Sequence, residues 1–267
     1  MKSAVLLHHL GFADLFSCNG IVNHFCEIYD KLYLIVDDVK KKKIVDNMYQ
    51  HQKNFECIIP EFININPGNE SCLRCHTKTT GRFCPRDTQQ GCQFVDWAKY
   101  KGYEIIKIGC FSEENDWFRY YLDPKNISFS HSFYTFAGLD PNIRIDKFKI
   151  SNNYLFLENQ HLEDNYISIH EDAQRGILID RNRLNMEPLS KIYLLDQKSD
   201  LMVDQIINLQ NSKELHFIDS SYSVLIYFLA FHDNKIRQIP KFLHRYTRIG
   251  RDTNIYTEPI PDNWNIL

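Results

Sequence analysis

The sequence predicts an α/β protein of two domains, each built on a parallel β-sheet, and three observations support this prediction. The apolar run of residues 4–7 breaks into a polar turn that contains Gly11 and Asp14, and a helical pattern follows. This order of buried strand, tight turn and helix is how a doubly wound domain begins. A similar junction recurs at residues 167–176. Strand and helix patterns also alternate along both halves, which is typical of parallel sheets.

The first half carries four expected strands, with helical patterns between and after them. Apolar and β-branched runs predict strands at residues 4–7, 31–36, 57–60 and 103–109. Helical spacing predicts helices at residues 15–29, 39–50, 94–101, 116–122 and 129–137. Residues 61–92 lose this periodicity and gather Asn, Gly, Pro and Cys, so we expect an irregular cysteine-rich insertion in the N-terminal domain.

The second half repeats the pattern after a polar boundary. Pro141 and the polar residues 151–153 place the boundary near residue 150, which gives domains 1–150 and 151–267. The expected elements are strands at residues 166–170, 191–196 and 214–219, and helices at 200–210 and 224–231. We expect the tail from residue 255 onward, which contains two prolines, to pack across a domain surface.

Composition limits the class of protein. The chain has 267 residues, of which 43% are hydrophobic and 24% charged, as in ordinary globular proteins. A net charge of −3 gives no chain-wide footprint for nucleic acid, which makes nucleic acid an unexpected partner. The start lacks the pattern of a secretory signal, and no apolar run is long enough to span a bilayer. We therefore expect a cytoplasmic protein with reduced thiols.

Three serines mark the first candidate site, at the start of the helix that follows the strand at 214–219. Ser220, Ser221 and Ser223 place hydroxyl groups where a helix presents unpaired N–H groups and the positive end of its dipole. Such a site suits a phosphate or pyrophosphate. The alternative is that Ser220 or Ser221 is simply an N-cap, and the two roles can coexist.

A second candidate group follows the strand at 166–170. Arg175, next to Gly176, is suited to bidentate contact with a phosphate, and His170 can donate to the same group or to a sugar hydroxyl. The alternative pairs Arg175 with Glu171 or Asp172 as a surface ion pair, which contributes little. The phosphate interpretation gains because adjacent parallel strands would bring this loop and the serine turn to one edge of the sheet.

These segments resemble the GT-B glycosyltransferases, which have two facing Rossmann-like domains. Residues 169–176 are similar to the strand and loop of fucosyltransferase-like members, whose arginine holds the nucleotide pyrophosphate, and residues 219–223 resemble their serine-rich turn. Residues 10–14 resemble the loop of heptosyltransferase-like members, where the aspartate is a proposed general base. The resemblance implies a nucleotide-sugar donor bound mainly by the C-terminal domain, and the acceptor by the N-terminal domain.

The implied reaction is an inverting transfer without a catalytic metal. An acceptor hydroxyl, on a glycan or another molecule, attacks the anomeric carbon while a nucleoside diphosphate leaves; a GDP-sugar is the favoured donor. Asp14 is the first choice of base and His9 or His8 the second, in a loop that turns at Gly11. The alternative for Asp14 is a helix cap. We expect Arg175 and Ser221 to stabilise the leaving group across a gap from Asp14.

Four cysteines of the insertion form a candidate metal site. Cys72 and Cys75 have the two-residue spacing of a zinc knuckle, and Cys84 and Cys92 complete a set of four thiolates. His76 can replace one of them. Four protein ligands leave no open position, so a zinc ion here would be structural. Free thiols, and disulfides under oxidising conditions, are the alternatives.

Two other functions stay open. One is a nucleic-acid or protein-binding module built on the cysteine knuckle and a basic C-terminal stretch that includes Arg237, Lys241 and Arg245. The other is a degenerate transferase that has kept the fold and lost the activity. Ala13, where the resembling members have glycine, and the late position of Arg175 keep the second of these open.

Overall fold

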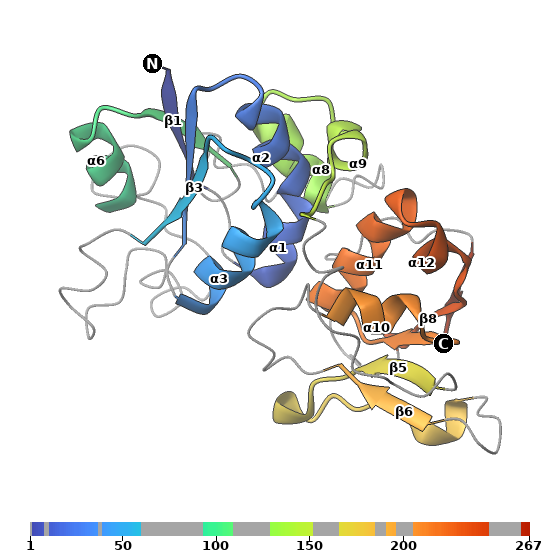
Figure 1. Cartoon of the computed structure of the whole chain (residues 1–267). Helices are drawn as coiled ribbons and strands as arrows, with labels where there is room; N and C mark the ends of the chain where they lie inside the picture. Colours follow the sequence, from blue (N-terminus) through green and yellow to red (C-terminus); the bar gives the residue numbers. More distant parts are fainter. Residues whose placement is uncertain are drawn as a thin grey trace. The chain divides into compact units, whose positions relative to one another are not determined.

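The computed structural model of the chain describes residues 2–7, 11–36, 39–59, 93–108, 129–151, 166–184, 191–195, 205–245 and 263–267. Contacts between Cα atoms divide the chain into two compact units, Met1–Ser151 and Asn152–Leu267 (Figure 1). Each unit is an α/β layer structure built on its own parallel sheet, which is the predicted fold class. No helix within the described ranges is long and apolar enough to cross a membrane.

The sheet of the first unit has four strands in the order β3-β2-β1-β4, all parallel. Its strands are β1 (Ser3–Leu7), β2 (Lys31–Ile35), β3 (Phe55–Ile58) and β4 (Glu104–Lys107). Residues 4–7 of the central strand β1 are buried, as their apolar sequence predicts. The chain moves outward from β1 to β3 and returns on the other side as β4. The carboxyl end of β1 therefore lies at a topological switch point, where ligands of such sheets bind.

Helices pack beside this sheet (Figure 1). They are α1 (Phe12–Ser17), α2 (Asn19–Cys26), α3 (Val39–Met48), α6 (Gln93–Tyr100), α8 (Phe129–Phe136) and α9 (Ile143–Asp146). The single helix predicted at 15–29 is wrong, because the chain turns at Cys18 and forms two helices. The carbonyl of Ser17 accepts a hydrogen bond from the Tyr134 hydroxyl at 2.9 Å. Gly20 is needed beside the turn, since a Cβ there would lie 2.5 Å from the carbonyl oxygen of Ile143.

Buried amides tie the end of the first unit to α2. The side chain of Asn23 donates to the carbonyls of Lys147 and Lys149 at 3.0 and 3.1 Å, and Asn19 accepts from the N–H of Lys149 at 2.7 Å. The N–H of Ser151 donates to the carbonyl of Met48 at 2.9 Å. These bonds satisfy backbone groups that no strand or helix pairs, so the segment after α9 stays on the body of this unit.

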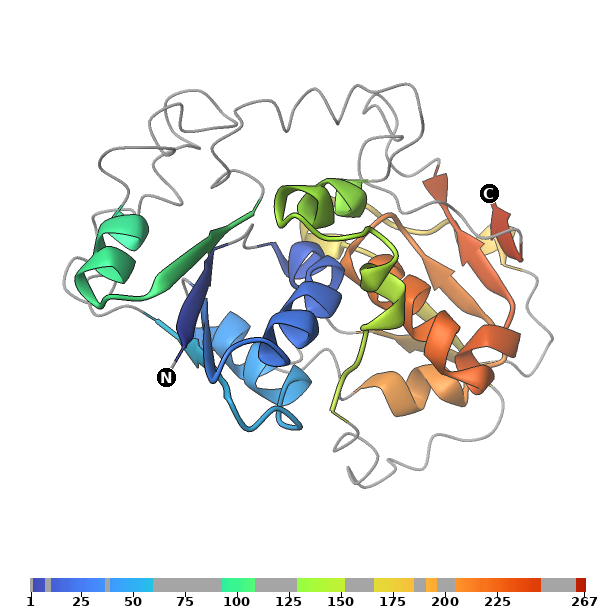
Figure 2. The ribbon, with the colours of Figure 1, turned by 90° about the horizontal axis from the view of Figure 1, so that it is seen from above.

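The sheet of the second unit has five parallel strands in the order β6-β5-β7-β8-β9 (Figure 2). They are β5 (Tyr166–His170), β6 (Lys191–Leu194), β7 (Leu215–Phe217), β8 (Lys241–Leu243) and β9 (Trp264–Ile266). The chain passes from β5 outward to β6 and returns to β7 on the other side of β5. The switch point of this sheet therefore lies between β5 and β7.

Different elements cover the two faces of this sheet. The helices α10 (Ile206–Gln210), α11 (Ser221–His232) and α12 (Asn234–Gln238) lie on one side (Figure 1). On the other face, Ile167 and Ile169 of β5 pack with Ile179 and Leu184. These last two flank the short helix η4 (Arg181–Arg183), which follows a similar turn, η3 (Ala173–Arg175).

The C-terminal part of the chain differs from its prediction in two ways. The last residues form β9 and extend the sheet at β8, where Leu267 donates to the carbonyl of Leu243 at 3.0 Å, instead of crossing a surface. Lys241, placed in a basic surface stretch, is fully buried in β8. Its Nζ donates to the carbonyls of Arg237 and Ile239 at 3.1 and 2.8 Å, and burial lowers its pKa to about 8. This lysine therefore caps the end of α12.

Candidate functional site

The candidate site of the second unit lies at its switch point. His170 ends β5, Ser220 follows β7, and these two strands pair directly in parallel. The Oγ of Ser220 lies 2.9 Å from Nδ1 of His170, within hydrogen-bond distance. The prediction that both loops reach the same edge of the sheet is therefore confirmed.

His170 is buried between β5 and α11. It has no exposed surface, and its ring centroid lies 4.5 Å from that of Tyr222 in the first turn of α11. Burial lowers the pKa of His170 to about 4, against a smaller opposing effect of Asp172. The imidazole is therefore neutral near pH 7. It can orient the Ser220 hydroxyl but brings no positive charge to a bound anion.

Ser220 occupies the N-cap position of α11, as the alternative interpretation expected, but its hydroxyl does not cap. Within the described part of the chain Ser220 makes no side-chain cap hydrogen bond, because its Oγ is turned to His170. Ser223 instead accepts from the N–H of Ser220 at 3.0 Å and donates to its carbonyl at 2.7 Å. Ser221, which is half-exposed, is the first residue of α11. Because α11 begins directly after β7, the unpaired N–H groups of its first turn lie at the carboxyl edge of the sheet.

The loop after β5 is a compact turn built around Asp172. The N–H of Arg175 donates to Oδ1 of Asp172 at 3.1 Å, and Nε of Arg175 lies 2.5 Å from Oδ2. Gly176 has a φ of 68°, which favours glycine, and a bridge between Asp172 and Ile177 closes the turn. The ion pair considered as an alternative for Arg175 is thus present. The side chain of Arg175 is still 63% exposed, so it remains accessible to a ligand.

Asp14 lies at the other switch point, after β1. Gly11, and not Asp14, is the N-cap residue of α1, but the carboxylate of Asp14, the third residue of the helix, accepts from the N-cap backbone, so the capping role considered as an alternative for Asp14 is present. The N–H of Gly11 donates to Oδ2 of Asp14 at 3.1 Å, and a Cβ at Gly11 would lie 2.7 Å from that oxygen. Burial raises the pKa of the half-buried Asp14 to about 7, although the Gly11 hydrogen bond and Lys41 both lower it.

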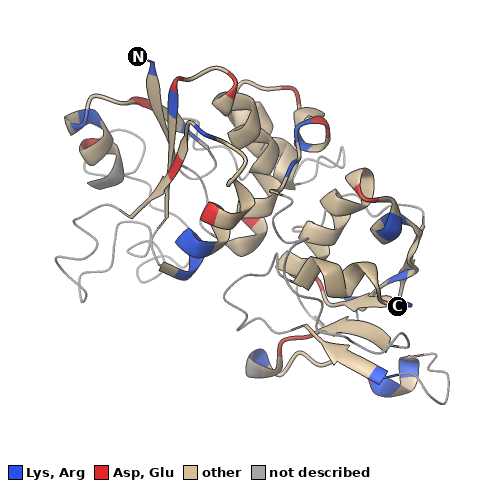
Figure 3. Cartoon of the chain, in the orientation of Figure 1, with Lys and Arg blue, Asp and Glu red and all other residues tan. Residues whose placement is uncertain are grey.

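Basic residues lie near this carboxyl group. Lys40 and Lys41 belong to the basic first turn of α3 (Figure 3). The Nζ of Lys40 lies 5.7 Å from the ring centroid of Phe12, the first residue of α1. A carboxyl group that is half ionised near neutral pH, at the carboxyl end of a central strand, is suited to accept a proton in catalysis.

Several predicted site residues lie outside the described residues. These are His8 and His9, proposed as alternative bases, and the cysteines Cys72, Cys75, Cys84 and Cys92. Among the residues that the structure does describe, no group of three or more His, Cys, Asp or Glu side chains could hold a metal ion. The zinc site stays a prediction.

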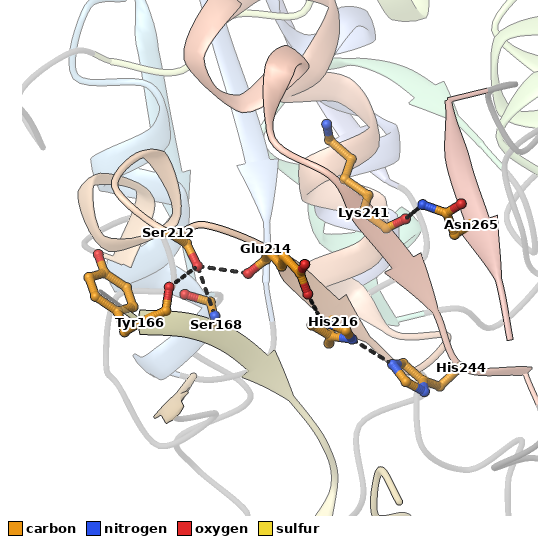
Figure 4. A network of polar contacts seen from close by, with 8 residues as sticks. All are labelled: Tyr166, Ser168, Ser212, Glu214, His216, Lys241, His244 and Asn265. Carbon is orange, nitrogen blue, oxygen red and sulfur yellow. Dashed lines mark hydrogen bonds and ion pairs between the residues drawn. The ribbon is translucent and has the colours of Figure 1, made fainter. Parts of the chain in front are cut away.

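Sequence analysis missed a buried polar cluster at β7 and β8. His216 and His244 lie within hydrogen-bond distance of each other, and Glu214 contacts His216 (Figure 4). The available signal was a histidine between two apolar residues of a predicted strand. The second histidine gave no signal, because the strand β8 that leads to it was not predicted.

Comparisons with known proteins found similar solved structures, among them two of the glycosyltransferase TibC. No family model matches the chain, and no curated protein matches it. One similar structure is the bacterial iron-containing dodecameric glycosyltransferase TibC from enterotoxigenic E. coli H10407, with 10% identity over 91% of this chain and a TM-score of 0.47. The other is the iron-containing heptosyltransferase TibC in complex with ADP-D-β-D-heptose, with 11% identity, 91% coverage and a TM-score of 0.46. The match covers 57% of each of those chains.

Proposed function

We propose that this protein is a glycosyltransferase that moves a sugar from a nucleotide-sugar to a hydroxyl group of an acceptor. The observation that carries the proposal is the meeting of His170, Ser220 and the first turn of α11 at the switch point of the second sheet. Hydroxyl groups, helix N–H groups and an accessible guanidinium at one sheet edge suit a diphosphate. The resemblance of the same segments to GT-B members supports the sugar-transferring class.

In this proposal the second unit binds the donor. His170 is neutral, so the positive charge toward the diphosphate comes from Arg175 and from the dipole of α11. His170 orients the Ser220 hydroxyl, and Asp172 holds Arg175 by its Nε. Fixed donors of this kind stabilise the charge that develops as a nucleoside diphosphate leaves, because they need no rearrangement during the reaction.

The first unit supplies the base. The pKa of Asp14, about 7, leaves a substantial fraction ionised at neutral pH and still basic enough to take a proton from an attacking hydroxyl. A single displacement with one carboxylate base inverts the anomeric centre, and it requires no catalytic metal. We propose a glycan or another hydroxyl compound as the acceptor and a GDP-sugar as the first donor to test.

The experiment is a thermal-unfolding screen of the full chain against GDP, UDP, ADP and CMP and their sugars. We expect one nucleoside diphosphate to raise the melting temperature, since a ligand at 100 times its dissociation constant stabilises the folded state by about 2.7 kcal/mol. Arg175→Ala should remove most of that stabilisation.

Arg183→Ala is the matched control. Like Arg175, Arg183 pairs with an aspartate three residues earlier, Asp180, and its side chain is 53% exposed. It should keep the nucleotide response. No response to any nucleoside diphosphate at millimolar concentration, or equal responses of the two variants, would contradict donor binding at this edge.

A further inference from the structure

The buried cluster of Glu214, His216 and His244 lies on the face of the second sheet opposite α11. Nε2 of His216 is 3.0 Å from Oε2 of Glu214, and Nδ1 of His216 is 2.9 Å from Nε2 of His244 (Figure 4). The two histidines are 1% and 0% exposed, whereas the side chain of Glu214 is 25% exposed. A carboxylate at the rim is thus connected through one imidazole to a second, fully buried imidazole.

The contacts determine where the protons lie when both imidazoles are neutral. A carboxylate only accepts, so His216 carries its proton on Nε2 and donates it to Glu214. Nδ1 of His216 then has a lone pair and accepts from Nε2–H of His244. The ring of His216 is fixed by stacking on Phe242, with centroids 4.5 Å apart and planes 5° from parallel. Neither imidazole can turn without breaking one of these contacts.

The surrounding charges oppose further protonation of the pair. Burial is the main reason why the pKa of His244 falls to about 4, and the charges of His216 and of Arg183 and Arg181 in η4 lower it further. Burial also lowers the pKa of His216, against the effect of Glu214 and with a smaller contribution from Arg181. The two arginines pair with Glu171 at 2.8 Å and Asp180 at 3.8 Å. Lys241, in the same strand as Phe242, points to the opposite side of the sheet (Figure 4).

The hydrogen-bond chain has room for one added proton and not for two. A first proton makes His216 an imidazolium that donates to Glu214 and to His244, whose own proton moves to Nδ1, so both contacts survive. A second proton puts N–H groups on both facing nitrogen atoms, 2.9 Å apart. No hydrogen bond can join two donors, and two cations would then face Arg181 and Arg183.

We propose that Glu214, His216 and His244 form an acid-sensitive latch that holds η4 and the end of β8 on the sheet at neutral pH and releases them on acidification. Ile179 and Leu184 flank η4 and cover Ile167 and Ile169 of β5, so the release exposes apolar core. The latch is independent of the proposed enzymatic function, because none of its residues binds the donor or accepts the proton in that scheme.

The test is hydrogen exchange of the full chain between pH 7 and pH 5, corrected for the intrinsic rates. The pKa of His244 is about 4 in the latch and 6.5 when exposed, so the opening constant should rise by about 20-fold over this range. The rise should appear in peptides covering residues 177–184 and 241–245. His244→Gln keeps an N–H donor and cannot ionise, so we expect it to remove most of the rise.

Two further variants sharpen the test. Glu214→Gln removes the carboxylate that stabilises the first added proton on His216, so the rise should become steeper. His131→Gln is the matched control, because His131 of the first unit also has a pKa lowered to about 4 and lies outside the latch. It should leave the exchange of these peptides unchanged. An equal acid response in the wild type and His244→Gln would overturn the proposal.

Nuclear magnetic resonance of the wild type provides a test that needs no variant. At pH 7 the imidazole nitrogen shifts should place the protons of both His216 and His244 on Nε2. A proton on Nδ1 of His244 at pH 7, or titration of His244 near pH 6.5, would also overturn the latch.

Discussion

The switch points of the two sheets are built alike, but the ionisable residue at the carboxyl end of the strand is different in each. After β1 the first unit places Asp14, whose pKa rises to about 7. After β5 the second unit places His170, whose pKa falls to about 4. Burial is the largest cause of both shifts, and it disfavours the charged form of each group.

Burial therefore gives these two sheet edges opposite acid–base properties. Burial makes the carboxyl group a stronger base than usual and keeps it able to exchange a proton near neutral pH. The same burial makes the imidazole a weaker base and leaves it a neutral hydrogen-bonding partner of Ser220. In the proposed function the first edge moves a proton, and at the second edge the neutral His170 only orients Ser220 toward the diphosphate.

The largest expected effect concerns the proton-moving edge. Asp14→Asn should lower the transfer rate by about 100-fold or more, since general base catalysis contributes that much. In the wild type the rate should rise with pH through about 7, because only ionised Asp14 accepts a proton. A pH-rate profile with the selected donor checks both. Asp46→Asn, which changes an exposed acid of α3 paired with Lys42, is the control and should keep the wild-type profile.

A smaller effect is expected at the anion-holding edge. His170→Ala should cost about 2–3 kcal/mol of unfolding free energy, because it opens a cavity and removes the partner of Ser220. Denaturant unfolding measures the loss. His131→Ala, at a half-buried site with a similarly lowered pKa, should cost less. An equal loss of unfolding free energy in the two variants would contradict the claim that full burial makes His170 more important for stability than the half-buried His131.

The smallest effect is a gain in stability at the first edge. The folded state binds a proton on Asp14 more tightly than the unfolded chain, so the stability from this group is lost as pH rises from about 4 through about 7. Asp14→Asn cannot ionise and can still accept from Gly11. After the solvent screening of this partly exposed carboxyl group is allowed for, the variant should be more stable than the wild type by about 1 kcal/mol at pH 8, by less at pH 5, and by nothing near pH 3. A loss of stability at pH 8 would show that the ionised form is not penalised.

Most of the fold could be predicted because its strands are apolar runs separated by amphipathic helices. The strand at Tyr166–His170 agrees with its prediction to the residue. The two short strands β8 and β9 could not be found this way. Lysine side chains are usually exposed, and Lys241 can be buried in β8 because two carbonyl groups at the end of α12 accept from its ammonium group. That partner is formed by the fold and leaves no local pattern.

The candidate site was predictable to a similar degree. Strand adjacency was enough to expect His170 and Ser220 at one edge, because parallel strands end together. Sequence could not reveal that the Ser220 hydroxyl would turn to His170, since serine at a helix start normally caps. It also could not reveal the contact of His216 with His244, whose residues are 28 positions apart and meet only through strand pairing.

The most direct test of donor binding is hydrogen exchange of the full chain with and without the nucleoside diphosphate that gives the largest thermal shift. The account predicts that the nucleotide slows exchange in peptides covering residues 170–177 and 219–224, at the carboxyl ends of β5 and β7. Arg175→Ala should weaken that protection. Protection that appears only in other segments, with these two unchanged, would contradict the assignment of this edge as the donor site.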